Sequence, residues 1–226
     1  MGIKINTANT DYLSDVTTPL NFNAAYSVLM HRKVGSSTGT FRLFHYLFNL
    51  TSGGEYDGLG IDSADVLYRM ESYGAPTGAA TTTAGTQGSV GAWEHLAHVR
   101  SSLTAHETFK NGSSLITDTA DVTSRSVIEE EYLGIVHPSL GFGDPASFAG
   151  FMSFTGALTA AQILAQSRSM TPILPNLYRW VPGVIAGSLG KDFSRNVRNM
   201  TVTGSPSLET TVPVVAWKRD AMMGMC

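Results

Sequence analysis

Apolar and polar residues alternate with a period of two along several short stretches of this chain. Residues 26–34 show this alternation, and residues 93–100 repeat it with Trp93, His95 and Ala97 on one of their two faces. A period of two is the side-chain period of a β-strand. Because Gly, Ser and Asn separate such stretches along the chain, the pattern predicts an all-β protein.

Other stretches extend this prediction. Residues 41–50 are apolar or aromatic on both faces, which is typical of a central strand that is covered on both sides. Further strands are expected in residues 61–73 (one bent strand or a pair), 127–136 and 148–154. Residues 51–60 are rich in Gly and are expected to form a loop, whereas residues 74–91 fit either a loop or a thin hairpin.

Two local signals are stronger than the rest. Asn111-Gly112 is a strong hairpin signal, because both residues of a two-residue turn require a positive φ. Thr159 and Gln162 have the spacing of a capping box at the start of a helix. The helix is expected over residues 160–169, ending before a proline.

These motifs together resemble a known family. The Trp-x-His-x-Ala strand of residues 93–97 with its later Asn-Gly turn, and the strand and helix start of residues 148–163, are similar to laminin G-like, concanavalin A-like jelly rolls. The resemblance implies an all-β, two-sheet antiparallel jelly-roll sandwich with one short helix near residues 160–169. It also implies core positions for Trp93 and Trp180, and a binding or structural module rather than an enzyme.

The order of the motifs is unusual for this family. Residues 177–204 are similar to the opening strand and loop of such domains, yet they come late in this chain. We therefore expect a permuted order, in which the C-terminal quarter supplies the closing strands. The length of 226 residues suits one domain over residues 1–226, with residues 216–226 as a C-terminal tail.

Charge and composition exclude several classes of function. The net charge is -3, only 15% of the residues are charged, and no basic stripe suggests nucleic-acid binding. No apolar run reaches the ~18 residues of a membrane helix, and the start of the chain does not resemble a signal peptide. The protein is therefore expected to fold in the cytoplasm of the cell that makes it. Cys226 is the only cysteine, so no internal disulfide is expected.

The sequence contains an incomplete hydrolase motif and one formal match to a nucleophile motif. Hydrolases with this fold carry Glu-x-Asp-x-x-Glu on one strand, and the nearest match here has Glu55 and Asp57 but Gly60 in the last position. Glycoside hydrolysis needs a pair of carboxyl groups, so we expect no enzyme activity, and a degraded hydrolase remains a weak alternative. The acids of residues 129–131 are expected at a solvated edge, and Gly-x-Ser-x-Gly at residues 35–39 is expected to be a turn.

Metal binding has one candidate loop. Asp192 and Asn196 match the Asp-x-Ser-x-Asn loop of the resembled family, which implies calcium, although Arg195 replaces the usual Gly. The alternative is a loop held by Asx-turns. His95 and His98 point to opposite faces of a strand and cannot share an ion. With a single thiol, a structural zinc site is not expected, and no other cofactor is predicted.

Two functions follow from the resemblance. The first is a structural and adhesive module of a bacteriophage virion, as a capsid decoration or tail-associated protein with carbohydrate binding. The second is a bacterial carbohydrate-binding lectin module, calcium-dependent or not, that is cytoplasmic or exported by a non-classical route. Under both functions, we expect the protein to bind surface glycans or other proteins, and we expect no binding to nucleic acid or membranes.

The C-terminal tail has its own prediction. Trp217, Met222 and Met223 are large apolar groups beyond the last expected strand, and Trp and Met are enriched where proteins bind each other. We expect them to contact another copy of the chain or another virion protein. The alternative is that the tail folds back over its own sandwich.

Overall fold

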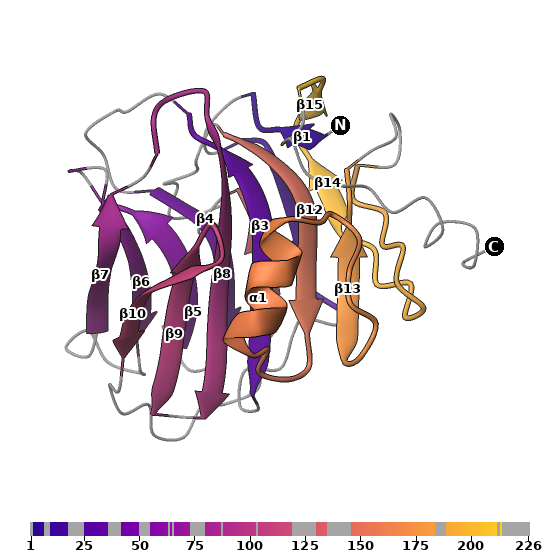
Figure 1. Cartoon of the computed structure of the whole chain (residues 1–226). Helices are drawn as coiled ribbons and strands as arrows, with labels where there is room; N and C mark the ends of the chain where they lie inside the picture. The colour runs from indigo at the N-terminus through magenta and orange to yellow at the C-terminus, as the bar shows by residue number, and fades with distance from the viewer. Residues whose placement is uncertain are drawn as a thin grey trace.

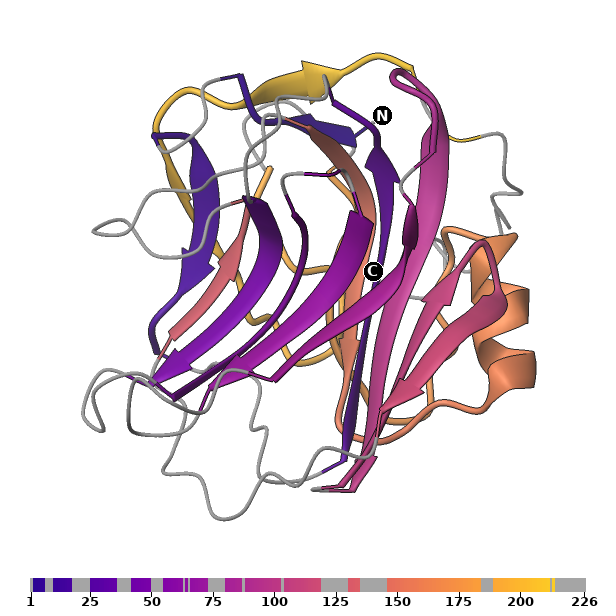
Figure 2. The same ribbon diagram turned by 90° about the vertical axis from the view of Figure 1, so that its left-hand side faces the viewer.

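The structure is a computed structural model of two packed antiparallel sheets and one helix (Figures 1 and 2). It describes residues 2–6, 10–17, 25–35, 42–49, 55–62, 64, 66–72, 80–86, 88–102, 104–118, 130–134, 146–183, 189–211 and 213. This architecture confirms the predicted antiparallel jelly-roll sandwich.

The sheet that we call sheet A has eight strands in the described residues. Its order is β10 (Ser113–Asp118), β9 (Ala105–Lys110), β8 (Trp93–Ser102), β3 (Tyr26–Lys33), β12 (Ser147–Phe154), β1 (Gly2–Lys4) and β15 (Ser207–Glu209), with β13 (Leu177–Val181) also paired to β12. The helix α1 (Ala160–Ser167) lies on the outer side of sheet A, as Figures 1 and 2 show.

The second sheet, sheet B, has seven strands in the described residues. Its order is β14 (Thr201–Thr203), β2 (Tyr12–Asp15), β11 (Glu130–Leu133), β4 (Arg42–Asn49), β5 (Glu55–Ile61), β6 (Val66–Ser72) and β7 (Ala80–Thr86). The C-terminal quarter supplies β13, β14 and β15, so it closes both sheets as the sequence predicts.

Sheet A is buried on both faces because it packs against two different layers. Val28 and Leu96 belong to an inter-sheet core that also contains Leu59 of sheet B. Ala97 belongs to a helix-side core together with Ile163 of α1. Neighbouring residues of β3 and β8 therefore alternate between the two cores, and the sequence pattern of two distinct faces is explained by two distinct coverings.

The two strongest local predictions are confirmed. Asn111 and Gly112 have φ values of 52° and 82°, and they join β9 to β10 as a two-residue turn. Thr159 caps α1, because its Oγ1 accepts from the Gln162 amide while Gln162 Oε1 accepts from the Thr159 amide. The helix ends at Ser167, two residues earlier than expected.

One of the two loop predictions was wrong. Residues 51–60 were expected to form a loop, but β5 begins at Glu55 and pairs with β4 on one side and β6 on the other. Hydrogen bonding along both edges stabilises a strand whose glycines have low intrinsic preference for one. Of residues 74–91, the described part contains β7 at the edge of sheet B. Residues 74–79 and 87 lie outside the described residues, so the choice between a loop and a thin hairpin stays open.

The acidic run was also misplaced by the sequence. Glu131 was expected at a solvated edge, but β11 lies between β2 and β4, and Glu131 is fully buried. Its carboxylate is compensated by Arg179 Nη1 and by His45 Nε2, the latter 3.2 Å away. Glu130 is half-buried and accepts a hydrogen bond from the Tyr132 hydroxyl, and residue 129 lies outside the described residues.

Some predictions fall where the structure gives no description. Residues 36–39 of the predicted turn and the tail residues Trp217, Met222 and Met223 lie outside the described residues. The single-domain boundaries and the tail contacts therefore stay predictions. Within the described part of the chain, no helix combines the length and apolar character needed to cross a membrane.

Candidate functional site

The predicted calcium loop is held together by its own hydrogen bonds. Asp192 is 3% exposed. Its Oδ1 accepts from the backbone amides of Trp180 and Ser194 at 2.8 and 2.7 Å. Its Oδ2 accepts from the Ser194 hydroxyl at 2.7 Å and from the Arg198 amide at 2.6 Å. Four donors therefore surround the carboxylate that calcium would need.

Asn196 is also engaged in holding the loop. Its side-chain amide donates to the carbonyl oxygens of Leu177 and Tyr178 at 3.0 and 2.9 Å. The Asn196 side chain therefore turns its amide nitrogen, and not a metal-binding oxygen, toward the backbone. Together, the side chains of Asp192 and Asn196 form turns that attach the loop to β13. This geometry favours the Asx-turn alternative, and calcium binding stays a prediction.

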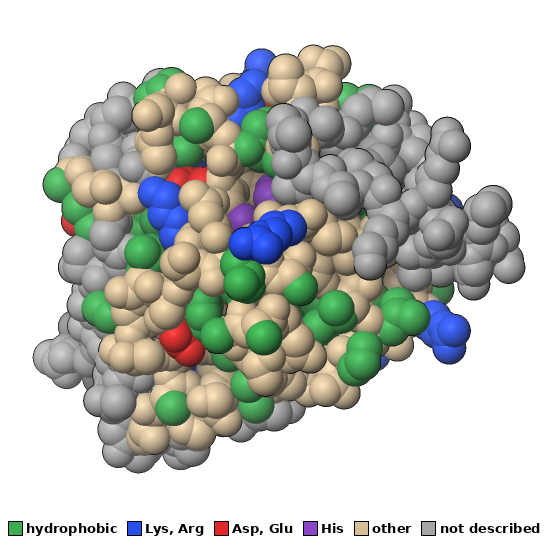
Figure 3. All heavy atoms as spheres, in the orientation of Figure 1, with side chains coloured by type: hydrophobic (Ala, Val, Ile, Leu, Met, Phe, Trp, Pro, Cys, Tyr) green, Lys and Arg blue, Asp and Glu red, His purple; other side chains and the backbone are tan. Residues whose placement is uncertain are grey.

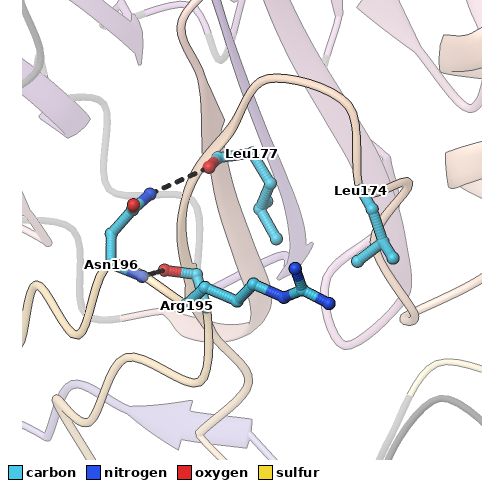
Figure 4. Close-up of a pocket in the computed structure, with 5 residues that line it drawn as sticks. Leu174, Leu177, Arg195 and Asn196 are labelled. Carbon is cyan, nitrogen blue, oxygen red and sulfur yellow. Dashed lines mark hydrogen bonds between the residues drawn. The ribbon is translucent and has the colours of Figure 1, made fainter. Parts of the chain in front are cut away.

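A shallow pocket of about 240 Å³ borders this loop (Figure 4). It is lined by Leu174, Leu177, Ser194, Arg195 and Asn196. Leu174 and Arg195 are exposed, and no aromatic side chain lines this pocket among the described residues. The pocket offers one guanidinium group but no flat apolar surface on which a sugar ring could stack.

The one described acid of the incomplete hydrolase motif is buried. Asp57 is 1% exposed and points into the inter-sheet core, where it accepts from the Tyr26 hydroxyl. The side chain of Glu55 lies outside the described residues, and Gly60 supplies no carboxylate. Because the nucleophile and acid of a glycosidase must both reach an open groove, Asp57 does not occupy such a position.

A set of polar and aromatic groups lies on the outer face of sheet A, at the C-terminal end of α1. We call it the helix-edge hollow. It has a volume of about 320 Å³ and is lined by His31, Trp93, His95, Asn111, Ser167, Arg168 and Pro213. Figure 3 shows histidine side chains in a recess of this face, next to a basic side chain.

Strand pairing brings the two histidines of the hollow together. His31 of β3 is directly opposite His95 of β8, and their rings are edge-to-face with centroids 4.9 Å apart. His31 Nε2 lies 3.4 Å from the carbonyl oxygen of Ser167 at the end of α1. The hollow is therefore assembled from sheet A and the helix together.

The hairpin turn fixes the floor of the hollow. Asn111 Oδ1 accepts from the backbone amide of His95 at 2.9 Å, and the Asn111 amide donates to the His95 carbonyl at 2.8 Å. The positive φ of Asn111 places its side chain for this contact. The Asn-Gly turn that the sequence identified as a hairpin signal thus also shapes a surface recess.

Burial keeps both histidines uncharged at neutral pH. Desolvation lowers the pKa of His31 from 6.5 to about 4, against the opposing effect of the Ser167 carbonyl. Desolvation also lowers the pKa of His95 well below 6.5, and the nearby His31 adds to this shift. Each neutral imidazole offers one donor and one acceptor nitrogen.

The hollow has the chemical groups that a hydroxyl-rich ligand requires. Among the described residues, Trp93 Nε1 and the Nδ1 atoms of His31 and His95 have no hydrogen-bond partner. Trp93 is partly exposed, so its ring offers apolar area beside these polar groups. Arg168 is exposed and adds a positive charge. Neutral donors and acceptors, an indole and a guanidinium suit a polar ligand with an acidic group.

Sequence analysis identified only part of this site. Trp93 and Trp180 were both expected in the core, and Trp180 is indeed 1% exposed, but Trp93 is partly exposed at the hollow. His95 was recognised only as a core histidine. His31 and Arg168 were missed, because no spacing in the sequence links residues that meet through strand pairing and helix docking.

Comparisons with known proteins bear on the fold. No protein-family model matches this sequence, and no curated protein does. The structure is similar to a heptameric SAP-like pentraxin from Limulus polyphemus, with a TM-score of 0.58, 16% identity, and coverage of 74% of this chain and 81% of that chain.

Two further structures carry carbohydrate-related names. The CBM40 of a Ruminococcus gnavus IT-sialidase, bound to α2,3-sialyllactose, matches with a TM-score of 0.59, 14% identity, and coverage of 74% of this chain and 96% of that chain. A putative carbohydrate binding protein from Bacteroides ovatus matches with a TM-score of 0.63 and 13% identity, over 94% of this chain and 62% of that chain. At these identities the likeness shows only the fold, which is an antiparallel jelly-roll sandwich.

Proposed function

We propose that this chain is a non-catalytic carbohydrate-binding module and that the helix-edge hollow is its glycan site. The observation that carries the proposal is the convergence of Trp93, two neutral histidines and Arg168 in one recess. Sugars are bound by aromatic faces together with donors and acceptors for their hydroxyl groups. Arg168 favours a glycan with a carboxylate, because a guanidinium pairs well with that group.

The similar structures support the same ligand class. One of them is a carbohydrate-binding module described with sialyllactose, and another is described as a putative carbohydrate binding protein. Sialyllactose contains a carboxylate, which is consistent with a ligand that Arg168 would recognise. The class of ligand, an acidic glycan, is therefore the proposal to test first.

A binding role fits the hollow better than a hydrolytic one. None of the described residues that line it carries a carboxyl group, whereas glycoside hydrolysis uses two in most families. The one described acid of the incomplete hydrolase motif, Asp57, points into the inter-sheet core. We therefore propose that the ligand is held without being cleaved.

We further propose that the module serves on a bacteriophage virion, as a capsid decoration or tail-associated protein. The support is the low charge of the sequence and its resemblance to stand-alone jelly rolls of phages. Pro213 lines the hollow, and Trp217 follows it by four positions in the sequence. Deletion of residues 217–226 should leave a folded protein that no longer assembles with its neighbours. Normal assembly of the truncated protein would contradict this role.

The glycan proposal is tested by binding measurements on the full chain. Wild-type protein is applied to a glycan microarray with sialylated, uronic-acid and neutral glycans, and hits are quantified by calorimetry. Arg168→Gln should weaken binding of an acidic glycan at least tenfold, and Trp93→Leu should weaken it by a similar factor. Arg195→Gln is the matched control, because Arg195 is also exposed but lines the pocket beside the Asp192 loop (Figure 4).

Two outcomes would contradict the proposal. If Arg195→Gln abolished binding while Arg168→Gln did not, the glycan site would be the pocket beside the Asp192 loop. If wild-type protein bound no glycan at millimolar concentration, carbohydrate binding itself would be refuted. Unfolding curves of each variant show whether a loss of binding reflects a loss of fold.

A further inference from the structure

We propose that Asp57, His98 and His106 form a binding site for a divalent transition metal ion of the zinc class, inside the sandwich and separate from the helix-edge hollow. One ligand atom from each of these residues lies within 4.8 Å of the other two. All three residues are buried, with exposures of 1%, 4% and 3%. This site is independent of the proposed glycan binding.

The topology explains why these three residues meet. His98 of β8 and His106 of β9 are diagonal neighbours on the inner face of sheet A, since His98 is opposite Thr108. Their rings are stacked, with centroids 5.8 Å apart and planes at 23°. Asp57 of β5 reaches them from sheet B, and its Oδ2 lies 3.8 Å from His98 Nε2.

The side chains around the cluster keep it polar. The Tyr26 hydroxyl donates to Asp57 Oδ2, and the Tyr26 ring lies 5.6 Å from that of His98. Arg100 is opposite His106 on β8, and its Nε donates to the Ser102 carbonyl at 3.3 Å. The inter-sheet core is therefore polar at this end of β8 and apolar around Leu96.

The ligand set indicates which ions fit. Two imidazoles and one carboxylate suit Zn²⁺, Co²⁺ or Ni²⁺, whereas Ca²⁺ and Mg²⁺ prefer oxygen ligands only. One carboxylate and two neutral imidazoles would leave a divalent ion with one net positive charge. Because sulfur is not required, the single cysteine of the chain does not argue against this type of site.

The atoms have to move closer together to bind an ion. Bonds of about 2.1 Å place tetrahedral ligands about 3.4 Å apart, which is less than the 3.8 Å between Asp57 Oδ2 and His98 Nε2. Side-chain rotations can provide a movement of that size. Because Asp57 belongs to sheet B and both histidines belong to sheet A, a bound ion would tie the two sheets together and stabilise the folded state.

The test uses full-length protein that has been purified with a chelator and then dialysed. Zinc is added in a calorimeter and in thermal unfolding, and cobalt is added to record its visible absorption. We expect one ion per chain and a higher melting temperature with zinc. His106→Gln and Asp57→Asn should each weaken zinc binding at least a hundredfold and remove the visible cobalt bands.

The matched controls are His31→Gln and His95→Gln, which alter the other buried histidine pair of sheet A. Each should leave zinc affinity within threefold of the wild-type value. Equal losses in His31→Gln and His106→Gln would overturn the assignment, as would the absence of binding to wild-type protein at millimolar zinc. If His106→Gln does not fold, cobalt-induced shifts in NMR spectra of the wild-type protein must map to His98 and His106, and shifts confined to other histidines would refute the site.

Discussion

The two faces of sheet A provide different environments for buried histidines. On the helix-covered face, His31 and His95 pack against each other, and no carboxylate lines the described part of their hollow. On the inner face, His98 lies 3.8 Å from Asp57, and sheet B contributes His45, 3.2 Å from Glu131. All four histidines are between 3% and 4% exposed, so the extent of burial does not distinguish them.

The difference lies in the charged partners. Burial outweighs the opposing effect of the Ser167 carbonyl, lowers the pKa of His31 to about 4 and keeps this histidine neutral. Between the sheets, burial opposes the charge of Glu131, but Arg179 and His45 outweigh it and lower the pKa of this carboxyl to about 2. The outer face therefore offers neutral groups suited to hydroxyls, and the inner face holds compensated charges.

The largest expected effect comes from breaking the inner network. Arg179 is fully buried and bonds to both Asp15 and Glu131. Arg179→Met should lower the free energy of unfolding by about 3–5 kcal/mol, because two buried carboxylates lose their cation. Urea unfolding at pH 7 measures the loss.

A control and a rescue sharpen this prediction. Arg195→Met changes an exposed arginine and should alter stability by less than about 0.5 kcal/mol. Adding Asp15→Asn and Glu131→Gln to Arg179→Met should restore part of the lost stability, because the unpaired charges are removed. A loss below about 1 kcal/mol for Arg179→Met would show that the network contributes little.

On the outer face of sheet A, the contribution of His31 to stability should depend on pH and not on an ion pair. The pKa of His31 is lowered in the folded state, so its contribution to stability is present above pH 6.5 and is lost as the pH falls from 6.5 toward 4. The lowering from 6.5 to about 4 corresponds to about 3 kcal/mol. Urea unfolding of the wild type and His31→Gln at pH 7 and 4.5 tests this.

The carboxylate of Glu131, between the sheets, affects stability in a lower pH range. The pKa of Glu131 is also lowered, so its contribution is lost as the pH falls from 4.5 toward about 2. His31→Gln should therefore reduce the pH dependence between pH 6.5 and 4.5, where His95 also contributes, and leave the loss below pH 4.5 unchanged. An unchanged slope between pH 6.5 and 4.5 in His31→Gln would show that His31 does not cause it.

A smaller loss of stability is expected when the N-cap of helix α1 is removed. Thr159 caps α1, which carries Ser167 and, just beyond its end, Arg168 of the hollow. Thr159→Ala should cost about 1 kcal/mol, as the loss of an N-cap usually does. Ser114→Ala on the edge strand β10 is the control and should change stability by less than about 0.5 kcal/mol. Equal melting temperatures for Thr159→Ala and wild type would show that the Thr159 cap does not stabilise the protein.

The smallest expected effect concerns calcium. The oxygens of Asp192 already accept four hydrogen bonds, so we expect equal melting temperatures in EDTA and in millimolar calcium. Binding at a hundredfold excess over the dissociation constant would add about 2.7 kcal/mol. A clear rise in melting temperature with calcium, absent in Asp192→Asn, would support the calcium prediction over the Asx-turn alternative.

The sequence alone determined the features that depend on near neighbours in the chain. The Asn111-Gly112 turn and the Thr159–Gln162 capping box form as predicted, because turn and cap chemistry act over a few residues. The alternation in β3 and β8 also predicted two different faces. Together with the family resemblance, these signals were sufficient for the two-sheet sandwich.

The tertiary structure decided the features that depend on distant partners. Gly-rich β5 is a strand because two neighbours pair with it, and Glu131 is buried because Arg179, 48 positions away, compensates its charge. The helix-edge hollow and the Asp57–His98–His106 cluster likewise join residues from different strands. The spacing of residues in the sequence does not predict these contacts between strands, because the order of the strands and the packing of the layers depend on the whole core.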